Sequence, residues 1–370
     1  MNGPDLLLPA PVQAAPLPEV RNHTPHPSQY YQMMDVGDEV FHVIASRITY
    51  DLTRLDEQGA PPLAAVQAPL VEADEFYGDP TSSSCIQESD FAPYKPKCDI
   101  ILAHAVAYAP EGKPHQRWPV GIRIGEWQKM LAVTGARYVD RGLLGWKVTE
   151  PQKATQVPLR WELAYGGSCQ WPRHLKEDEE PEIFKAFEAN PLGTGWTDKA
   201  WLKKAQVADV DAPQIEVFDQ PFGTEEANAM AYPAVGVGPV GKWWTPRRQK
   251  AGTYDQAWKE SRWPRLPLDF DFGYWNAAPE DQQIEYPQGG EELVLAGLTA
   301  GQQVWRCKLP EPAIHAVLRM QIGPIVRLPM RLDTLVLDFK AGTLSCVYRI
   351  HVAAQFGPRV LEIRSGRAPI

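Results

Sequence analysis

The chain has 370 residues, of which 44% are hydrophobic and 22% are charged, as is usual for a globular protein. Its 37 basic and 46 acidic side chains give a net charge of −9, which argues against a nucleic-acid-binding protein, because such proteins neutralise phosphates. There are 36 prolines, about a tenth of the chain against a typical ~5%, and proline interrupts helices, so a bundle of long helices is excluded.

The chain begins with a proline-rich segment, residues 1–27, which holds seven prolines and no apolar periodicity. We expect an extended arm there, partly in the polyproline II conformation, and a single domain over residues 28–370. In residues 39–165, β-branched and aromatic residues alternate with others between turn residues, which predicts an N-terminal region of antiparallel strands. The predicted strands are Glu39–Leu52, Asp99–Tyr108, Pro119–Ile124, Lys129–Val139 and Val157–Leu163.

The middle of the chain, residues 166–290, is rich in Gly, Pro and Trp and has weak periodicity. Three short helices are expected in it, at Glu182–Ala189, Asp198–Ala205 and Tyr254–Ser261. So many tryptophans do not fit solvated disorder, so we interpret the remainder as ordered loop packed on a sheet.

A C-terminal β region, residues 291–370, completes the chain. Its predicted strands are Glu292–Leu298, Gln303–Leu309, Ala316–Ile322, Thr334–Phe339, Thr343–Val352 and Val360–Ile363, and Lys340-Ala341-Gly342 predicts a hairpin. We therefore expect a mainly β fold of antiparallel sandwich-like or barrel-like sheets with few short helices, in which both β regions pack around the irregular middle.

The cysteines and the N-terminus indicate the cellular compartment. The five cysteines are odd in number, widely spaced and without a C-x-x-C pair, which favours reduced thiols over a disulfide framework. No run approaches the ~18 apolar residues of a membrane span. Leu6-Leu7-Leu8 lacks the flanking regions of a signal peptide. We expect a cytoplasmic protein with no membrane insertion.

Several short sequence motifs are weak indications of a nucleotide-binding, metal-binding or catalytic site. Residues 236–242 contain G-x-x-x-x-G-K, but Trp243 replaces the required Ser or Thr, so we expect a structural turn. Asp269 and Asp271 could ligate a metal or act as paired acids, but capping of turns or pairing with arginine is the simpler expectation. The acidic run at 176–182 is read as a solvated loop, or alternatively as a docking surface for a basic partner. The histidines show no metal-ligand spacing, and no cofactor or metal is expected.

Blocks of residues, which follow one another in the family's order, resemble a known family: the type VI secretion effector adaptor/chaperone family, long catalogued only as a domain of unknown function. The blocks are Ser89–Asp99 with Asp90, Lys95 and Asp99; Tyr165-Gly166-Gly167; Asn190-Pro191-Leu192-Gly193-Thr194-Gly195-Trp196; Trp244-Thr245-Pro246-Arg247; Gly252-Thr253-Tyr254-Asp255-Gln256-Ala257-Trp258; Pro267-Leu268-Asp269-Phe270-Asp271; Asn276-Ala277-Ala278-Pro279-Glu280-Asp281-Gln282-Gln283; and Gly289-Gly290-Glu291. Each block is weak by itself, but together they span roughly residues 39–350.

The resemblance implies a non-catalytic binding protein. Such adaptors stabilise a secreted effector and help load it onto the spike, a valine-glycine repeat protein tipped by a PAAR or PAAR-like protein. Because Trp, Tyr and Arg usually anchor protein interfaces, Trp243, Trp258 and Trp275 are candidate partner-binding residues, although burial against the sheet is the commoner fate of a tryptophan. Two alternatives stay open: an enzyme, hydrolytic or metal-dependent, that uses Asp255, Asp269 and Asp271, and a carbohydrate-binding β module.

Overall fold

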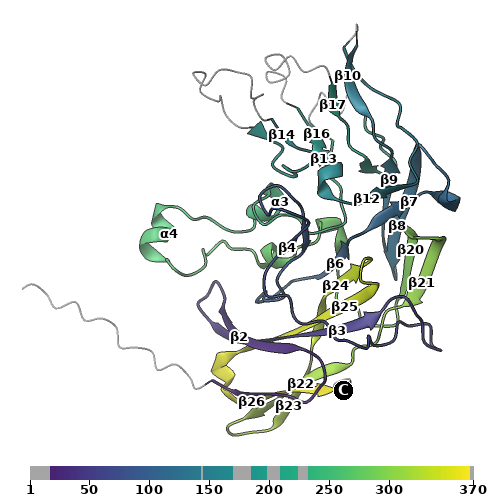
Figure 1. Cartoon of the computed structure of the whole chain (residues 1–370). Helices are drawn as coiled ribbons and strands as arrows, with labels where there is room; N and C mark the ends of the chain where they lie inside the picture. The colour runs from purple at the N-terminus through teal and green to yellow at the C-terminus, as the bar shows by residue number, and fades with distance from the viewer. Residues whose placement is uncertain (1–16, 143–144, 170–184, 198–208, 224–231, 367–370) are drawn as a thin grey trace, which may run out of the picture.

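The computed structural model describes residues 17–142, 145–169, 185–197, 209–223 and 232–366 (Figure 1). Within these residues the protein is mainly β, with two short α-helices, as the sequence predicts. The described strands form several open, mostly antiparallel sheets, and none of them closes into a barrel.

The central sheet has six strands in the order β19-β6-β24-β25-β3-β2. It combines strands from both ends of the sequence: β3 pairs antiparallel with β25, and β6 pairs parallel with β24. The strands are β2 (Ser28–Met34), β3 (Val40–Asp51), β6 (Cys98–Ala103), β19 (Gln283–Ile284), β24 (Arg331–Asp338) and β25 (Thr343–Ala353). The predicted hairpin at residues 340–342 joins β24 to β25.

A second sheet has five strands in the order β18-β9-β8-β20-β21. Its strands are β8 (Arg117–Ile124), β9 (Trp127–Thr134), β18 (Ile215–Val217), β20 (Glu292–Thr299) and β21 (Gln302–Lys308). Here too a strand of the C-terminal region, β20, pairs with a strand of the N-terminal region, β8.

A third sheet of four strands, in the order β1-β26-β22-β23, lies beside the central sheet (Figure 1). Its strands are β1 (Glu19–Asn22), β22 (Ile314–Met320), β23 (Ile325–Pro329) and β26 (Pro358–Ser365). The end of the proline-rich N-terminal segment, expected to be extended, is therefore an edge strand, and it pairs parallel with β26. Residues 1–16 lie outside the described part.

One hydrophobic core joins the three large sheets. Because side chains alternate across a strand, Ile44 and Ile48 of β3 point to one face of the central sheet, where they share a buried cluster with Leu295 of β20 and Leu361 of β26. The opposite face of the central sheet is covered by irregular segments, so β3, β6 and β25 are buried on both faces.

The remaining described elements are short. The small sheets pair β4 (Glu75–Phe76) with β5 (Cys85–Gln87), β7 (Val106–Tyr108) with β12 (Gln156–Pro158), β10 (Tyr138–Gly142) with both β11 (Gly145–Val148) and β17 (Asp209–Asp211), β13 (Tyr165–Gly166) with β16 (Thr194–Gly195), and β14 (Ser168–Cys169) with β15 (Lys185–Ala186). The α-helices are α3 (Thr245–Arg248) and α4 (Gln256–Ser261). The 3₁₀ turns are η1 (Pro110–Gly112), η2 (Trp161–Leu163), η3 (Phe272–Trp275), η4 (Glu280–Gln282) and η5 (Ala354–Phe356). None of the described helices is long and apolar enough to cross a membrane.

Some predicted elements differ from the structure. The strand predicted over Asp99–Tyr108 breaks into β6 and β7 because His104 adopts φ 54, a left-handed conformation that ends the pairing. The strand predicted over Val157–Leu163 ends in η2. Of the helix predicted over Glu182–Ala189, the described part contains β15 instead, because Lys185 and Ala186 pair with β14. The helix predicted at Tyr254–Ser261 is confirmed as α4, and the one at Asp198–Ala205 lies outside the described residues.

In the four-stranded sheet, the buried carboxylate of Glu362 on β26 binds two arginines. Nε of Arg319 and Nη2 of Arg364 donate to it over 2.5 and 2.6 Å. The hydrogen bond from Arg319 is the main reason why the pKa of Glu362 falls to about 2.

We predict that Glu362→Gln destabilises the protein most at neutral pH. The folded pKa lies below the unfolded value of ~4.3, so the carboxylate contributes its stability above pH ~4.5 and loses it as the pH falls toward 2. Urea unfolding should show a deficit of about 1.5–3 kcal/mol at pH 7 that shrinks between pH 4.5 and 2.5. Glu57→Gln, on an exposed loop, is the control. A deficit independent of pH would contradict the ionic role of Glu362.

Candidate functional site

The covered face of the central sheet carries a buried layer of charged side chains. Arg47 of β3 binds Asp90 over 3.0 Å, and Arg349 of β25 binds Asp333 of β24 over 2.6 Å. All four side chains are almost fully buried. Because burying an unpaired charge is costly, each of these groups requires its partner.

The carboxylate of Asp99 on β6 accepts hydrogen bonds from two blocks that are far apart in the sequence. It accepts hydrogen bonds from Lys95 Nζ at 2.8 Å and from Asn276 Nδ2 at 3.0 Å. The backbone N–H groups of Ala277 and Ala278 donate to it at 2.9 and 3.2 Å. The blocks around residues 90–99 and 276–283, both singled out from the sequence, are therefore joined by one buried carboxylate with a structural role.

Arg247 of α3 ties the next block to the same layer. Its guanidinium donates hydrogen bonds to the backbone oxygens of Tyr274 and Val240 at 2.7 and 2.8 Å. It also forms a bidentate ion pair with the carboxylate of Glu88. Pro246 is the second residue of this helix and is exposed. The neighbouring Trp244 is buried, so the W-x-P-R block fixes a loop against the sheet.

The glycines of two further blocks lie where the backbone passes very close to other atoms. A Cβ on Gly166 would lie 2.1 Å from the oxygen of Asn190, and one on Gly193 would lie 2.5 Å from the oxygen of Ala164. The amide of Asn190 donates to the backbone oxygens of Trp161 and Tyr165 at 2.9 and 3.1 Å. These contacts hold β13 beside β16.

The remaining block residues also have structural placements. Three of them, Pro191, Gly195 and Pro279, are buried, and three glycines, Gly167, Gly252 and Gly290, adopt positive φ. The side chain of Gln282 donates hydrogen bonds to the backbone oxygens of Ile100 and Val237, and that of Gln283 donates to the backbone oxygen of Ala278. The carboxylate of Glu291 accepts the N–H of Gln288.

The segment at residues 236–242 is held by contacts with other parts of the protein. Lys242 forms an ion pair with Asp74 at 2.5 Å, and Lys129 donates to the oxygen of Gly236 at 2.7 Å. A Cβ on Gly241 would lie 2.5 Å from the indole nitrogen of Trp244. These contacts fit the structural segment expected from the sequence, which bends at residues 237–238 and turns at residue 242.

The three aspartates considered for catalysis have separate structural roles. Asp255 caps α4 by accepting the N–H of Trp258 at 2.8 Å, and Asp271 accepts the N–H of Gly273 at 2.7 Å. Asp269 accepts the N–H and the hydroxyl of Thr253, and these bonds lower the pKa of Asp269. All three side chains are exposed. No group of three or more potential metal ligands gathers in the described residues.

The chain from residue 249 to residue 271, which we call the arm, projects from the body of the protein and carries α4 (Figure 1). Its two ends are held together by the N–H of Asp271, which donates to the oxygen of Lys250 at 2.9 Å. Arg262 and Arg265 hold its side by binding Asp38 in the β2–β3 turn at 2.9 and 2.8 Å. No residue of α4 is buried.

The arm displays large apolar side chains. Trp263 is 67% exposed, Leu268 is 72% exposed and Tyr254 is 52% exposed. Trp258, a residue selected from the sequence, is half-buried because its ring packs against Tyr254 with centroids 4.7 Å apart. These exposed apolar side chains make the arm a candidate binding surface.

The other two tryptophans selected from the sequence flank the arm in the chain. Trp243 is 52% exposed, whereas Trp275 is half-buried and its ring contacts Tyr274. Sequence reasoning did not single out Trp263, and it noted Leu268 only within a motif. The prolines next to both, Pro264 and Pro267, are a signal that could have placed them on a loop.

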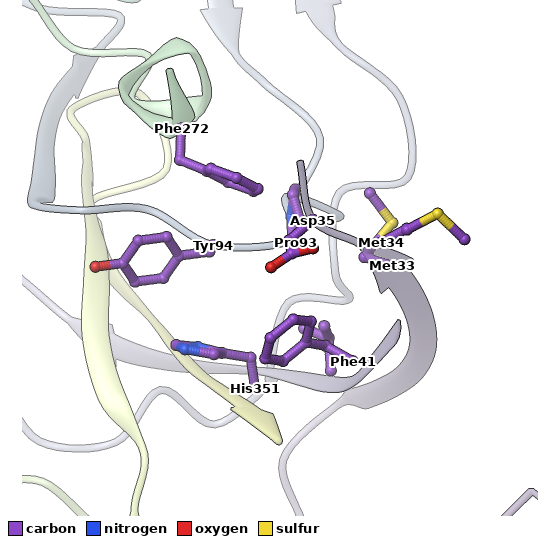
Figure 2. Close-up of a pocket in the computed structure, with 9 residues that line it drawn as sticks. Met33, Met34, Asp35, Phe41, Pro93, Tyr94, Phe272 and His351 are labelled. Atoms are coloured by element: carbon purple, nitrogen blue, oxygen red, sulfur yellow. The ribbon is translucent and has the colours of Figure 1, made fainter. Parts of the chain in front are cut away.

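An aromatic pocket of about 250 Å³ lies near the base of the arm (Figure 2). Figure 2 shows Phe272 on one side, Phe41 and His351 on the other, and Tyr94 across from Asp35 and Pro93. The lining is completed by Met33, Met34, Val43 and Pro93. The rings of Tyr94 and His351 meet edge to face with centroids 4.9 Å apart. The pocket therefore offers aromatic faces and one carboxylate.

Comparison with known proteins gives one match. A family model described as "Uncharacterized protein conserved in bacteria (DUF2169)" matches residues 37–349, more than four fifths of the chain. Searches of the curated proteins and of the solved structures found no match. The matched residues include every block named above, the arm, and most of the aromatic pocket.

Proposed function

The chain belongs to this family of uncharacterised bacterial proteins, and on that premise we propose that it is a non-catalytic adaptor that binds and stabilises another protein. The observation that carries the proposal is the arm, which displays Tyr254, Trp263 and Leu268 on a segment anchored at its base and along its side. Rigid, exposed aromatic side chains are the usual anchors of protein interfaces.

The resemblance of the sequence blocks to the type VI secretion adaptor family supplies the finer form of the proposal. The partner is a secreted effector, held in the cytoplasm until it is loaded onto a valine-glycine repeat spike protein or its PAAR-like tip. The acidic charge of the chain and its exposed aromatic residues fit a protein partner better than a nucleic acid.

The two alternatives receive less support from the geometry. Asp255 and Asp271 are exposed caps of separate helical turns, and the exposed Asp269 binds Thr253, whereas a catalytic acid or base is typically set in a pocket that shifts its pKa upward or matches it to the reaction. A sugar-binding platform needs coplanar aromatic rings, and the rings of Tyr254 and Trp258 are inclined by 72°.

The test is co-expression with the products of the adjacent genes, followed by pull-down and size-exclusion chromatography. We expect a stable complex with a toxin or a PAAR-like protein, and a more soluble effector when the adaptor is present. The control is the same effector expressed alone.

The adaptor proposal is wrong if no neighbouring product binds while the purified protein turns over a substrate or retains stoichiometric metal. In that case Asp255→Asn, Asp269→Asn and Asp271→Asn should be assayed for loss of that activity.

A further inference from the structure

The outer edge of β2 is open for pairing. β2 is the last strand of the central sheet, and no other described segment pairs with its free edge. Its seven residues, SQYYQMM, include no charged residue and no proline. Proteins usually protect a sheet edge of this length with lysine, proline or a bulge, because an unprotected edge pairs with other strands. The edge of β2 has none of these devices.

The hydrogen bonds around β2 show which backbone groups face outward. The N–H of Arg47 donates to the oxygen of Pro27, and the N–H of Asp35 donates to the oxygen of Glu39, so the backbone of every second residue from Pro27 to Asp35 faces β3. The backbone groups of Tyr30 and Gln32 then face away from β3. Consistent with this, the oxygen of Tyr30 accepts a hydrogen bond from the side chain of Gln29.

The aromatic pocket opens on the same side of the sheet as one row of β2 side chains. Met33 pairs with Phe41, and Val43 pairs with His351, so these four residues line the pocket from three adjacent strands. A strand added to β2 would lie about 4.8 Å from it and would direct alternate side chains to this face. Only a long side chain on the added strand would reach the rings.

The chemistry of the pocket suits a cation. Aromatic faces attract a positive charge, and Asp35 adds a carboxylate to the pocket lining. Oδ1 of Asp35 accepts the N–H groups of Gly37 and Glu39 at 2.8 Å each, whereas Oδ2 accepts no hydrogen bond from the described residues. Burial and the positive charges of Arg331 and Arg349 lower the pKa of His351, so its imidazole is neutral at pH 7. Of these two arginines, Arg349 is paired with Asp333, whereas the charge of Arg331 opposes a cation.

We propose that a partner protein adds an extended segment to the outer edge of β2 and places an arginine or lysine side chain in the aromatic pocket. A second copy of β2 has no arginine or lysine to place there, because the strand contains neither. The proposal deepens the proposed adaptor function by naming the mode of binding, and it rests on that function.

The proposal is tested with immobilised seven-residue peptides that alternate serine and valine around a central arginine, lysine, norleucine or glutamate. The full-length protein should bind the arginine and lysine peptides at least tenfold more tightly than the norleucine peptide, and the glutamate peptide least. The preference should weaken at high salt. Asp35→Asn, which keeps an oxygen for Gly37 and Glu39, should reduce arginine binding to the level of norleucine.

Gln32→Pro removes an outward N–H without removing a bond to β3, and it should abolish binding of every peptide. Gln32→Thr keeps that N–H and is the matched control, expected to bind normally. The proposal is overturned if no peptide binds the native protein better than the proline variant, or if norleucine binds as well as arginine. A native dimer that Gln32→Pro dissociates would also overturn it, in favour of self-association. These results do not depend on co-expression, so the adaptor function can stand when this mode of binding fails.

Discussion

Replacement of Asp99 by alanine is expected to lower the free energy of unfolding by about 3–5 kcal/mol, because the change leaves Lys95 charged and unpaired in the interior. It also removes the acceptor for Asn276 and for the backbone N–H groups of Ala277 and Ala278. The measurement is urea unfolding followed by tryptophan fluorescence at neutral pH. Asp99→Asn keeps one oxygen acceptor and should lose less.

The control for this prediction is Arg248→Ala. Arg248 pairs with Glu188 on the surface, where both side chains are more than half exposed, and such pairs contribute about 0–1 kcal/mol. If Asp99→Ala and Arg248→Ala lower stability equally, the buried layer does not hold the two sequence blocks together. If Asp99→Ala yields no folded protein, Asp99→Asn supplies the comparison.

Replacement of Trp263 by alanine is expected to weaken binding of the co-expressed partner about 30-fold, which corresponds to about 2 kcal/mol. The side chain is 67% exposed in the free protein, so its removal should change the stability of the adaptor by less than about 0.5 kcal/mol. Isothermal titration calorimetry gives the affinity, and thermal unfolding gives the stability.

Ile322→Ala is the matched control for the arm. Ile322 is 96% exposed in the turn between β22 and β23, which belongs to the four-stranded sheet. Its replacement should leave the affinity unchanged. Equal losses in both variants, or none for a double variant lacking Trp263 and Leu268, would exclude the arm as the binding surface.

The long strands could be predicted from the sequence because their burial leaves a clear pattern. β3 and β25 are rich in β-branched and aromatic residues, and both were predicted to within two residues at each end. β2 and β23 were missed because they are half-exposed and contain polar residues or proline. Their pairing depends on neighbours that the local pattern does not reveal.

The site could be predicted only in part, since burial in the middle of the chain depends on distant contacts. Trp244 is buried against Trp161, with ring centroids 5.3 Å apart, whereas its neighbour Trp243 is exposed. Both residues are tryptophans with nearly the same neighbours in the sequence, so the local sequence does not distinguish them. Likewise, the spacing of Asp269 and Asp271 suggested a pair, but one binds Thr253 and the other caps η3.

The parallel pairing of β6 with β24 has a consequence for how the chain is made. Asp99 of β6 lies beside Thr334 of β24, so the ribosome must synthesise more than two hundred further residues before the centre of the sheet can close. Pairing between such distant strands slows folding, and unpaired hydrophobic strands are prone to aggregate during the delay. The growing chain, with β3 and β6 made and β24 and β25 still absent, is therefore the form of this protein that most needs protection in the cell.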